Sequence, residues 1–323
     1  MQTTGWTRAA ALACTAVLAL AGCATDVRSR VAVPGPPERT ECGTLTIANL
    51  PWIGYEANVA VLAHLAKTRL DCTVVVKDLT AEEAWAEVAA GSTDVIVENW
   101  GRESLKKRYI DEERAAVEHG MTGNKGVVGW YIPPWLAEQY PDITDWKNLN
   151  DYAYLFQTPT SGGKGVLLNG DPSYETNDRA LIRNLKLNYT VDTTGSEDKL
   201  IEAFREGERN RRPVIGYFYA PQWFLAEVDL VHIELPPYTP GCDAKPEKVA
   251  CDYQPYDLDK IANRKFAESG SPAAELIKNF QWTNADQNEV ARYLTVDKLS
   301  HDEAAKKWLD ANPEVWQSWL PAD

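Results

Sequence analysis

Short apolar runs along the chain alternate with longer stretches whose apolar residues recur at helical spacing. This alternation predicts an α/β fold with mixed, mostly parallel sheets flanked by helices. Two helix starts carry capping boxes, Thr80 with Glu83 and Ser300 with Glu303. The predicted strands are 44–50, 73–77, 94–97, 127–132, 213–219 and 230–235. The predicted helices are 58–70, 80–90, 146–154, 176–188, 197–209, 272–280, 283–294 and 301–312.

The first 40 residues have a different pattern and predict a targeting segment rather than part of the fold. Arg8 precedes an apolar run over 9–20 that is too short to span a bilayer. The run ends in Leu-Ala-Gly-Cys, which resembles a bacterial lipobox with Cys23 as the lipid-bearing residue. We therefore expect a lipoprotein signal peptide over 1–22 and a flexible, proline-bearing tether over 23–40. An ordinary cleaved signal followed by a chance cysteine is the alternative.

The net charge of the chain limits the classes of partner that it is expected to bind. The formal net charge is −14, and removal of the signal with Arg8 makes it −15. A strongly acidic surface argues against nucleic acid and against anionic lipid as partners. No stretch after the signal is apolar enough to cross a membrane.

Four cysteines lie beyond the signal, as expected for a protein of an oxidising compartment. They allow three pairings, and we favour Cys42–Cys72 and Cys242–Cys251. Cys42 and Cys72 each precede a predicted strand, and neighbouring parallel strands begin side by side, within disulfide reach. Cys242 and Cys251 close a short loop. Free buried thiols are the alternative, and a zinc site is disfavoured because no CxxC pair or nearby histidine accompanies the cysteines.

Aromatic residues gather at the ends of predicted strands. The chain has 12 tryptophans and only 6 phenylalanines, although packing alone gives no reason to prefer the larger indole. Trp52 and Trp100 follow two strands of one sheet, Trp130 lies at the first predicted crossover between lobes, and Tyr219 and Trp223 lie at the return crossover. Other tryptophans lie in helical patterns or near the surface and are expected to be structural: Trp85, Trp135, Trp146, Trp308, Trp316 and Trp319.

Ring faces that converge on one cleft suit a methylated ammonium group, which has diffuse charge and no N–H to donate. The predicted cage therefore consists of Trp52, Trp100, Trp130, Tyr219 and Trp223. The carboxylate of a betaine would need N–H donors. The candidates are the backbone of Gly54 and Tyr55 at a helix start and the glycine-rich loop 161–163. Glu56 and Glu98 either assist the cation or are solvated and paired with basic neighbours.

The order of these motifs resembles the glycine betaine/choline-type substrate-binding proteins of ABC importers. The resemblance rests on the lipobox, the Trp52 loop, the segments 94–100 and 217–223, and the tail 284–320. It implies a two-lobed, Venus-flytrap (type II periplasmic-binding) fold, with family cage positions at Trp52, Trp100 and Tyr219 and a second-lobe aromatic at Trp130 or Tyr131. Where the family often has Trp-x-Pro-His-Trp, this chain has Tyr-Ala-Pro-Gln-Trp at 219–223, and Gly54 replaces a polar residue.

The resemblance gives an expected organisation and function. Lobe 1 comprises 41–131 and 227–323, and lobe 2 comprises 132–226. The protein is expected to capture a small quaternary-ammonium compound, such as glycine betaine or choline, and to deliver it to an ABC permease. It works from the outer face of the cytoplasmic membrane, anchored through Cys23, and has no catalytic residues, cofactor or metal.

A secreted carbohydrate-binding or glycoside hydrolase lipoprotein is the alternative function. Tryptophans also stack on sugars, and a pair of carboxylates performs glycosidic chemistry, a role in which Glu56 and Glu98 would serve. Sugar sites need many polar side chains around the rings, and the loops of this chain offer few. The scattered histidines and the lack of HExxH, GxSxG and dinucleotide-binding motifs also favour binding over catalysis.

Overall fold

The computed structural model describes residues 41–174 and 176–322, so the signal peptide, Cys14, Cys23 and almost all of the tether lie outside the described residues. The strands are β1 (Thr44–Asn49), β2 (Thr73–Asp78), β3 (Val95–Asn99), β4 (Ala116–Ile132), β5 (Gly165–Asn169), β6 (Tyr189–Thr193), β7 (Gly216–Ala220), β8 (Val231–His232) and β9 (Tyr256–Asn263). The α-helices are α1 (Ile53–Arg69), α2 (Ala81–Ala90), α3 (Glu103–Lys106), α4 (Pro134–Gln139), α5 (Leu149–Tyr152), α6 (Asp178–Asn184), α7 (Glu197–Arg209), α8 (Arg264–Ala267), α9 (Pro272–Asn279), α10 (Asn284–Thr295), α11 (His301–Ala311) and α12 (Pro313–Trp316).

The strands of the described residues pair in the order β2-β1-β3-β9-β4-β7-β5-β6, and β8 pairs with β4. The outer pairs β1–β2, β1–β3, β5–β6 and β5–β7 are parallel, whereas β9 and β4 pair antiparallel with their neighbours. The predicted mixed α/β class is therefore confirmed. Parallel strands are joined by helices, and the antiparallel strands in the centre carry the long connections.

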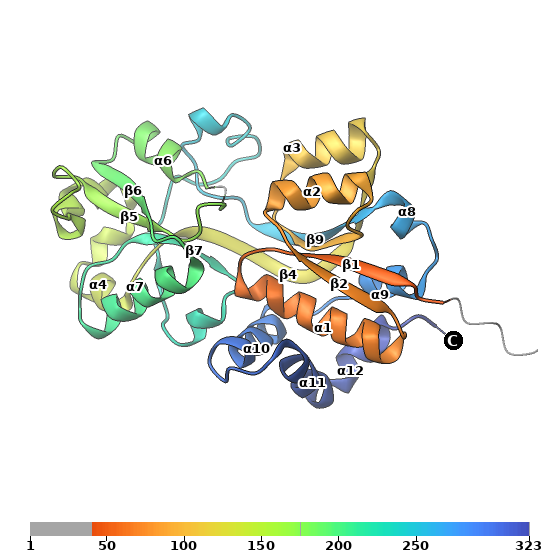
Figure 1. Ribbon diagram of the computed structural model, residues 1–323. Helices are drawn as coiled ribbons and strands as arrows, with labels where there is room; N and C mark the ends of the chain where they lie inside the picture. Colours follow the sequence, from red (N-terminus) through yellow and green to blue (C-terminus); the bar gives the residue numbers. More distant parts are fainter. Residues whose placement is uncertain (1–40, 175, 323) are drawn as a thin grey trace, which may run out of the picture. The chain divides into compact units, whose positions relative to one another are not determined.

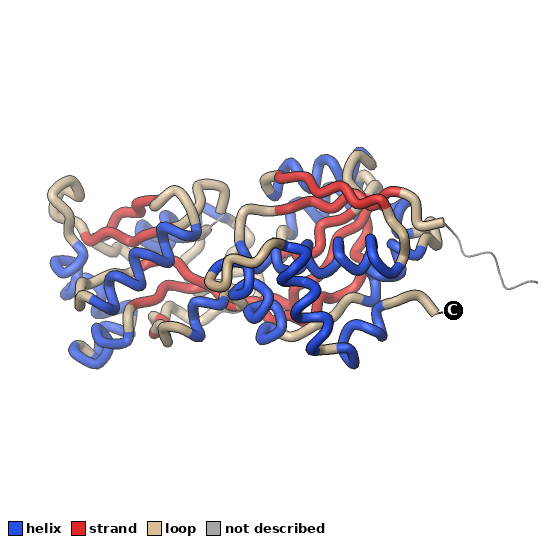
Figure 2. Tube along the Cα trace, turned by 60° about the horizontal axis from the view of Figure 1, so that its bottom comes forward, coloured by secondary structure: helices blue, strands red, loops and turns tan. Residues whose placement is uncertain are grey.

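Strand β4 belongs to both halves of the sheet (Figure 1). Its first part, up to Gly126, pairs with β9, and its last part, from Val127, pairs with β7 and β8. We call β1, β2, β3, β9 and the first part of β4 the A half, and the other strands with the last part of β4 the B half. Helices α1, α10 and α11 lie on one side of the A half and α2 on the other (Figure 1), and helices flank the strands of both halves (Figure 2).

Helix α1 is buried around most of its circumference because it packs between the sheet and the helices α10 and α11. The sequence of α1 suits a buried helix, since most residues from Gly54 to Ala66 are apolar or small. The neighbouring C-terminal helices add a cluster of tryptophans, in which the rings of Trp308 and Trp319 stack with centroids 5.9 Å apart. Trp308, Trp316 and Trp319 are buried, so the prediction that they are packing residues is confirmed. Trp85 is also buried and stacks on Tyr109, with centroids 6.1 Å apart.

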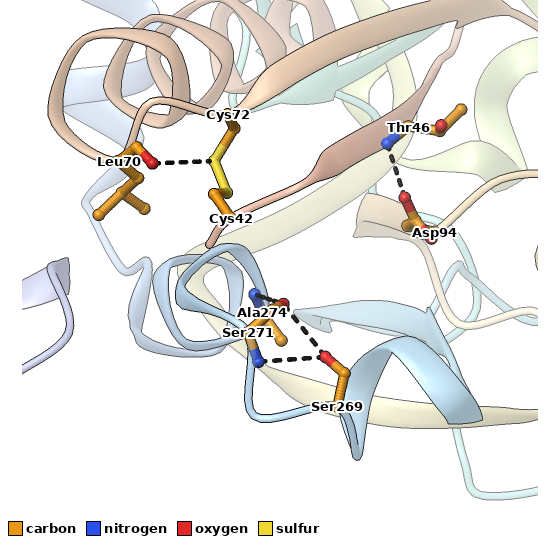
Figure 3. The surroundings of a disulfide bond; sticks show 8 residues. All are labelled: Cys42, Thr46, Leu70, Cys72, Asp94, Ser269, Ser271 and Ala274. Carbon is orange, nitrogen blue, oxygen red and sulfur yellow. Dashed lines mark hydrogen bonds between the residues drawn. A yellow bond between two sulfur atoms is a disulfide. The ribbon is translucent and has the colours of Figure 1, made fainter. Parts of the chain in front are cut away.

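Two disulfides join Cys42 to Cys72 and Cys242 to Cys251, the pairs that the sequence favoured. The first bridges the starts of β1 and β2, where Thr44 lies opposite Thr73 in parallel register (Figure 3). The Cα atoms of Cys42 and Cys72 are 5.0 Å apart, within the range of an unstrained bridge. In the same region the backbone N–H of Thr46 donates to the carboxylate of Asp94 at 2.7 Å, which ties β1 to the start of β3.

Three strands were not predicted from the sequence, and a fourth is longer than predicted. Strand β4 begins at Ala116 rather than at 127. Its first part was not predicted because bulges and the positive φ angles of Gly120 and Gly123 interrupt the alternation of apolar and polar residues. Strands β5 and β6 were also missed. Strand β9 carries Asp259 and Lys260 at buried positions, which conceals its strand character. Asp259 is paired with Lys106 at 2.7 Å, so its charge is not isolated.

Lys260 is fully buried, and its Nζ donates to the carbonyls of Lys278 and Phe280 at the end of α9, at 3.0 and 2.5 Å. Burial lowers the pKa of Lys260 from 10.5 to about 7. Above pH 7 the folded chain therefore releases a proton that the unfolded chain retains, so stability rises with pH until the unfolded lysine also titrates.

We expect the free energy of unfolding of the wild-type protein to rise by about 2 kcal/mol between pH 7 and pH 9 through Lys260 alone. Urea unfolding of wild type and Lys260→Met at both pH values measures this difference. The variant should lose the rise because methionine does not titrate. Equal pH slopes in the two proteins would show that Lys260 keeps an ordinary pKa in the fold.

Candidate ligand-binding site

A cavity of about 1090 Å³ lies between the A half and the B half. The A half contributes residues that follow β1 and β3, and the B half contributes residues at the ends of β5 and β7. These are the carboxyl ends of parallel strands, the edge at which ligands bind in open α/β sheets. Trp52, Glu98, Trp100 and Tyr219 from the predicted set line this cavity.

Trp52 and Trp100 are brought together by a single carboxylate. Their indole N–H groups both donate to Oε1 of Glu98, at 3.0 and 2.7 Å. The other carboxylate oxygen of Glu98 accepts from the side-chain amides of Asn58 and Gln287, at 2.7 and 2.8 Å. Glu98 is 1 % exposed, and the four donors compensate for its burial. Glu98 therefore fixes the orientation of both indoles.

Trp100 is also held from behind. Its ring lies against Gly126 of β4, where a Cβ atom would come within 2.7 Å of the indole. The ring of Tyr256 contacts it at a tilt, with centroids 5.7 Å apart. A glycine at position 126 thus leaves the room that the indole occupies.

Four aromatic rings from the two halves stand edge to face in sequence around the cavity. The ring planes of Trp52 and Tyr174 meet at 80°, those of Tyr174 and Tyr219 at 89°, and those of Tyr219 and Trp100 at 84°. The centroid distances are 6.4, 6.3 and 5.8 Å. Glu98 links Trp52 and Trp100, so the series of contacts among the four rings returns to its starting point. We call these residues the four-ring wall: Trp52, Trp100, Tyr174 and Tyr219.

A second buried carboxylate joins the two halves beside Tyr219. Glu197, the first residue of α7, accepts hydrogen bonds from the Tyr219 hydroxyl, from Gln222 Nε2 at 3.0 Å and from the backbone N–H of Ile53 at 2.8 Å. Ile53 begins α1 in the A half, where backbone N–H groups lack helical partners. Glu197 therefore positions a wall ring and also ties the halves together.

A third buried carboxylate, Asp178 of α6, supports the B half of the cavity. Its Oδ1 accepts from the Tyr253 hydroxyl at 2.8 Å and from the Trp130 indole at 2.7 Å. Its Oδ2 accepts from Asn169 Nδ2 at 2.7 Å and from Thr176 Oγ1 at 2.8 Å. Tyr253, Asn169 and Thr176 line the cavity. Asp178 fixes these polar groups as Glu98 fixes the indoles.

Burial raises the pKa of Glu98, Glu197 and Asp178, whereas their hydrogen-bond donors act in the opposite direction and favour the charged form. Each carboxylate accepts at least three hydrogen bonds. Taken over the three carboxylates, most of the donors are N–H groups, which cannot act as acceptors for a protonated carboxyl. In their charged forms, Glu98 behind Trp52 and Trp100 and Glu197 beside Tyr219 would attract a cation to the cavity.

Two of the tryptophans that were predicted to join the cage lie elsewhere. Trp130 is 1 % exposed and packs in the core of the B half, where its N–H is used by Asp178. Trp223 is buried against Phe224, and the guanidinium of Arg205 lies 5.9 Å from its ring centroid. Both rings are covered by protein and do not line the cavity, because their strand and turn direct them into the core.

Neither of the predicted donors at the start of α1, Gly54 and Tyr55, lines the cavity. The Tyr55 N–H donates to Trp52 O at 3.0 Å, and its buried hydroxyl accepts from Val97 N at 2.9 Å. Gln287 covers Gly54, leaving no space for even a Cβ atom. Glu56 faces His301 Nε2 at 3.3 Å, outside the cavity. The 161–163 segment is a turn that does not line the cavity.

Several residues that line the cavity could not be recognised from the sequence pattern alone. Tyr174 lies in a loop without periodic pattern, and Tyr217, Tyr253 and Tyr256 are separated from it along the chain. The supporting carboxylates Asp178 and Glu197 are equally hidden, because an acidic residue at a helix start is expected for capping alone. Spacing gives one usable signal. Tyr217 and Tyr219 alternate on β7, so recognition of Tyr219 as a wall residue places Tyr217 on the same face.

None of the helices in the described residues is long and apolar enough to span a membrane. Within the same residues, no group of three or more histidine, cysteine, aspartate and glutamate side chains is placed to hold a metal ion.

Residues 43–311 match the family model described as the substrate binding domain of ABC-type glycine betaine transport system. The trimethylamine N-oxide-binding protein of Pelagibacter ubique (strain HTCC1062) is 32 % identical over 194 residues, which are 57 % of this chain and 61 % of that protein. The glycine betaine/carnitine transport binding protein GbuC of Listeria monocytogenes serotype 1/2a (strain 10403S) is 23 % identical over 176 residues, which are 54 % of this chain and 51 % of that protein. The chain thus spans little more than half the length of these curated relatives.

Two solved structures have the same fold. Lactococcal OpuAC, in a closed conformation with glycine betaine, gives a TM-score of 0.68 at 17 % identity over 86 % of this chain and 100 % of that chain. An ABC-transporter choline binding protein in complex with choline gives a TM-score of 0.68 at 16 % identity, over 86 % of this chain and 91 % of that one.

Proposed function

Because the chain belongs to the family of substrate-binding domains of ABC-type glycine betaine transport systems, we propose that it captures a small solute with a trimethylammonium head between its two halves. The observation that carries this proposal is the four-ring wall with Glu98 behind it. Perpendicular ring planes present several faces to one small volume, and the carboxylate adds charge attraction.

The ligand class follows from what the wall offers. Each desolvated ring contributes about 0.5–2 kcal/mol to the binding of a cation, and three or four rings reach roughly micromolar affinity after the cost of association. Glycine betaine and choline fit this chemistry, and the Pelagibacter relative adds trimethylamine N-oxide as a candidate. All three ligands share the trimethylated nitrogen.

The two halves are proposed to act as lobes that close on the solute, with the B half containing 132–226 together with the last part of β4 from Val127 and strand β8. Glu197 supports this role because it accepts from Ile53 in the A half and from Tyr219 in the B half. The closed form would then dock on an ABC permease at the outer face of the cytoplasmic membrane, with lipidated Cys23 as the anchor. A ligand that contacts both lobes stabilises the closed form.

The carbohydrate-hydrolase alternative needs a free carboxylate pair at the rings. Glu98 has both oxygens occupied by four donors, and Glu56 lies outside the cavity beside His301. This arrangement supports binding without turnover.

A thermal-shift panel tests the proposal. A trimethylated ligand at 100 times its Kd stabilises the folded state by about 2.7 kcal/mol, which raises the Tm of a chain of this size by roughly 5 °C. Choline, glycine betaine and trimethylamine N-oxide form the test set, and ethanolamine and glycine are the unmethylated controls. An equal response to the unmethylated amines would identify an ordinary amine pocket and contradict the proposal.

A further inference from the structure

Tyr217 lies in the B half at the centre of the cavity's tyrosines. It precedes Tyr219 by two residues on β7, and it lies opposite Trp130 in the antiparallel register with β4. Its ring centroid is 6.0 Å from that of Tyr174, 6.0 Å from that of Tyr219 and 6.2 Å from that of Tyr253. Tyr217 is therefore enclosed by rings while it lines the cavity.

The hydroxyl of Tyr217 differs from those of its neighbours because it has no hydrogen-bond partner in the described part of the chain. The Tyr219 hydroxyl donates to Glu197, and the Tyr253 hydroxyl donates to Asp178. Tyr217 is 9 % exposed as a residue, but its hydroxyl is not enclosed by protein and is accessible from the cavity that the residue lines. A hydroxyl in a concave site that has no protein partner can bond to a ligand that enters the site.

The hydroxyl is suited to donate rather than to accept. Burial and the nearby charge of Asp178 raise the pKa of Tyr217, so it keeps its proton at any physiological pH. The carboxylates that hold the neighbouring tyrosines, Asp178 and Glu197, already accept hydrogen bonds on both oxygens, and neither accepts from Tyr217. An acceptor for this hydroxyl can enter through the cavity.

We infer that the Tyr217 hydroxyl is the hydrogen-bond donor that the site offers to an anionic oxygen on its ligand, the oxygen of an N-oxide or of a carboxylate. This inference rests on the proposed function, because the four-ring wall must hold the trimethylammonium head that carries the oxygen. The four-ring wall then binds the trimethylammonium head, and Tyr217 binds the oxygen that the ligand carries. Tetramethylammonium, which has no oxygen, satisfies the wall alone.

The test is the variant Tyr217→Phe, with affinities measured by calorimetry for trimethylamine N-oxide, glycine betaine and tetramethylammonium. Removal of one hydrogen bond to a charged acceptor should weaken binding of at least one oxygen-bearing ligand by about tenfold or more. The affinity for tetramethylammonium should change by less than about twofold. The variant should fold as well as wild type, since it removes a hydroxyl that has no partner in the described residues.

The matched control is Tyr219→Phe on the same strand, where the lost hydroxyl serves Glu197. This variant should weaken all three ligands by similar factors, because it releases a ring of the wall. An unchanged affinity of Tyr217→Phe for both oxygen-bearing ligands, or an equal loss for tetramethylammonium, would overturn the inference and leave the proposed function intact. A wild-type protein that binds none of the three ligands would instead contradict the proposed function itself.

Discussion

Replacing Trp100 by alanine is expected to weaken choline binding by about 30-fold or more. Trp100 forms one edge of the four-ring wall and contacts Tyr219 and Tyr256. The loss combines about 2 kcal/mol of desolvated cation–π attraction with the apolar contact of the indole. The variant also removes one of the four donors to Glu98.

Calorimetric titration of choline into wild type and variant measures this effect. Trp100→Phe should give a smaller loss, since it keeps a ring face and removes only the donor. Trp146→Ala is the control for the loss of an indole in general, because Trp146 packs in the B half away from the cavity. A folded Trp100→Ala protein with wild-type affinity would remove this residue from the site.

Trp100 and Trp52 were accessible from the sequence for a specific reason. Both follow strands of one parallel sheet, and parallel strands bring their carboxyl ends to the same edge. Local signals performed well for the same part of the chain: the capping box at Thr80 is formed, and α7 spans 197–209 as predicted. Register also explains the disulfide between Cys42 and Cys72, since adjacent parallel strands start together.

The remainder of the site depends on contacts between distant segments. Alternation along β4 shows that Trp130 faces one side of the sheet, but not that Asp178, from another element, covers its N–H. Glu197 reads as an ordinary acidic residue at a helix start, and only the tertiary structure brings it to Ile53. Tyr174 carries no periodic pattern at all. The central position of β9 is similarly non-local, because Asp259 pairs with Lys106 and Lys260 donates to the carbonyl of Lys278, both distant in the sequence.

Glu98 is the residue whose removal should have the largest effect on the site. Glu98→Ala leaves four donors without an acceptor, on Trp52, Asn58, Trp100 and Gln287. Buried donors without partners cost about 1–3 kcal/mol each, so the variant should lose about 3 kcal/mol or more of folding stability. Choline binding should fall by more than 100-fold because both indoles lose their orientation and the charge behind them.

Glu98→Gln separates the charge of Glu98 from its positioning role. The amide oxygens of Asn58 and Gln287 have no partner in the described residues. The amide of Gln287 can therefore turn over and accept from the new NH₂ group, while Asn58 keeps its bond to the Gly54 carbonyl and the glutamine oxygen continues to accept from the two indoles. This variant should fold and keep the wall in place. Its choline affinity should fall by about tenfold, since one unit of negative charge is lost at short range.

The pH dependence of choline affinity distinguishes Glu98→Gln from wild type more clearly than the affinity at a single pH. Choline keeps its charge at every pH, so any change in affinity comes from the protein. Burial raises the pKa of Glu98, which means that the wild-type carboxylate is protonated, and its attraction lost, at a higher pH than for an ordinary glutamate. Glu197 and Asp178 are shifted in the same direction but are present in both proteins. Wild type should therefore lose more affinity than Glu98→Gln as the pH falls from 7 to 5. Parallel pH profiles would show that the carboxylate holds the indoles without contributing its charge to the ligand.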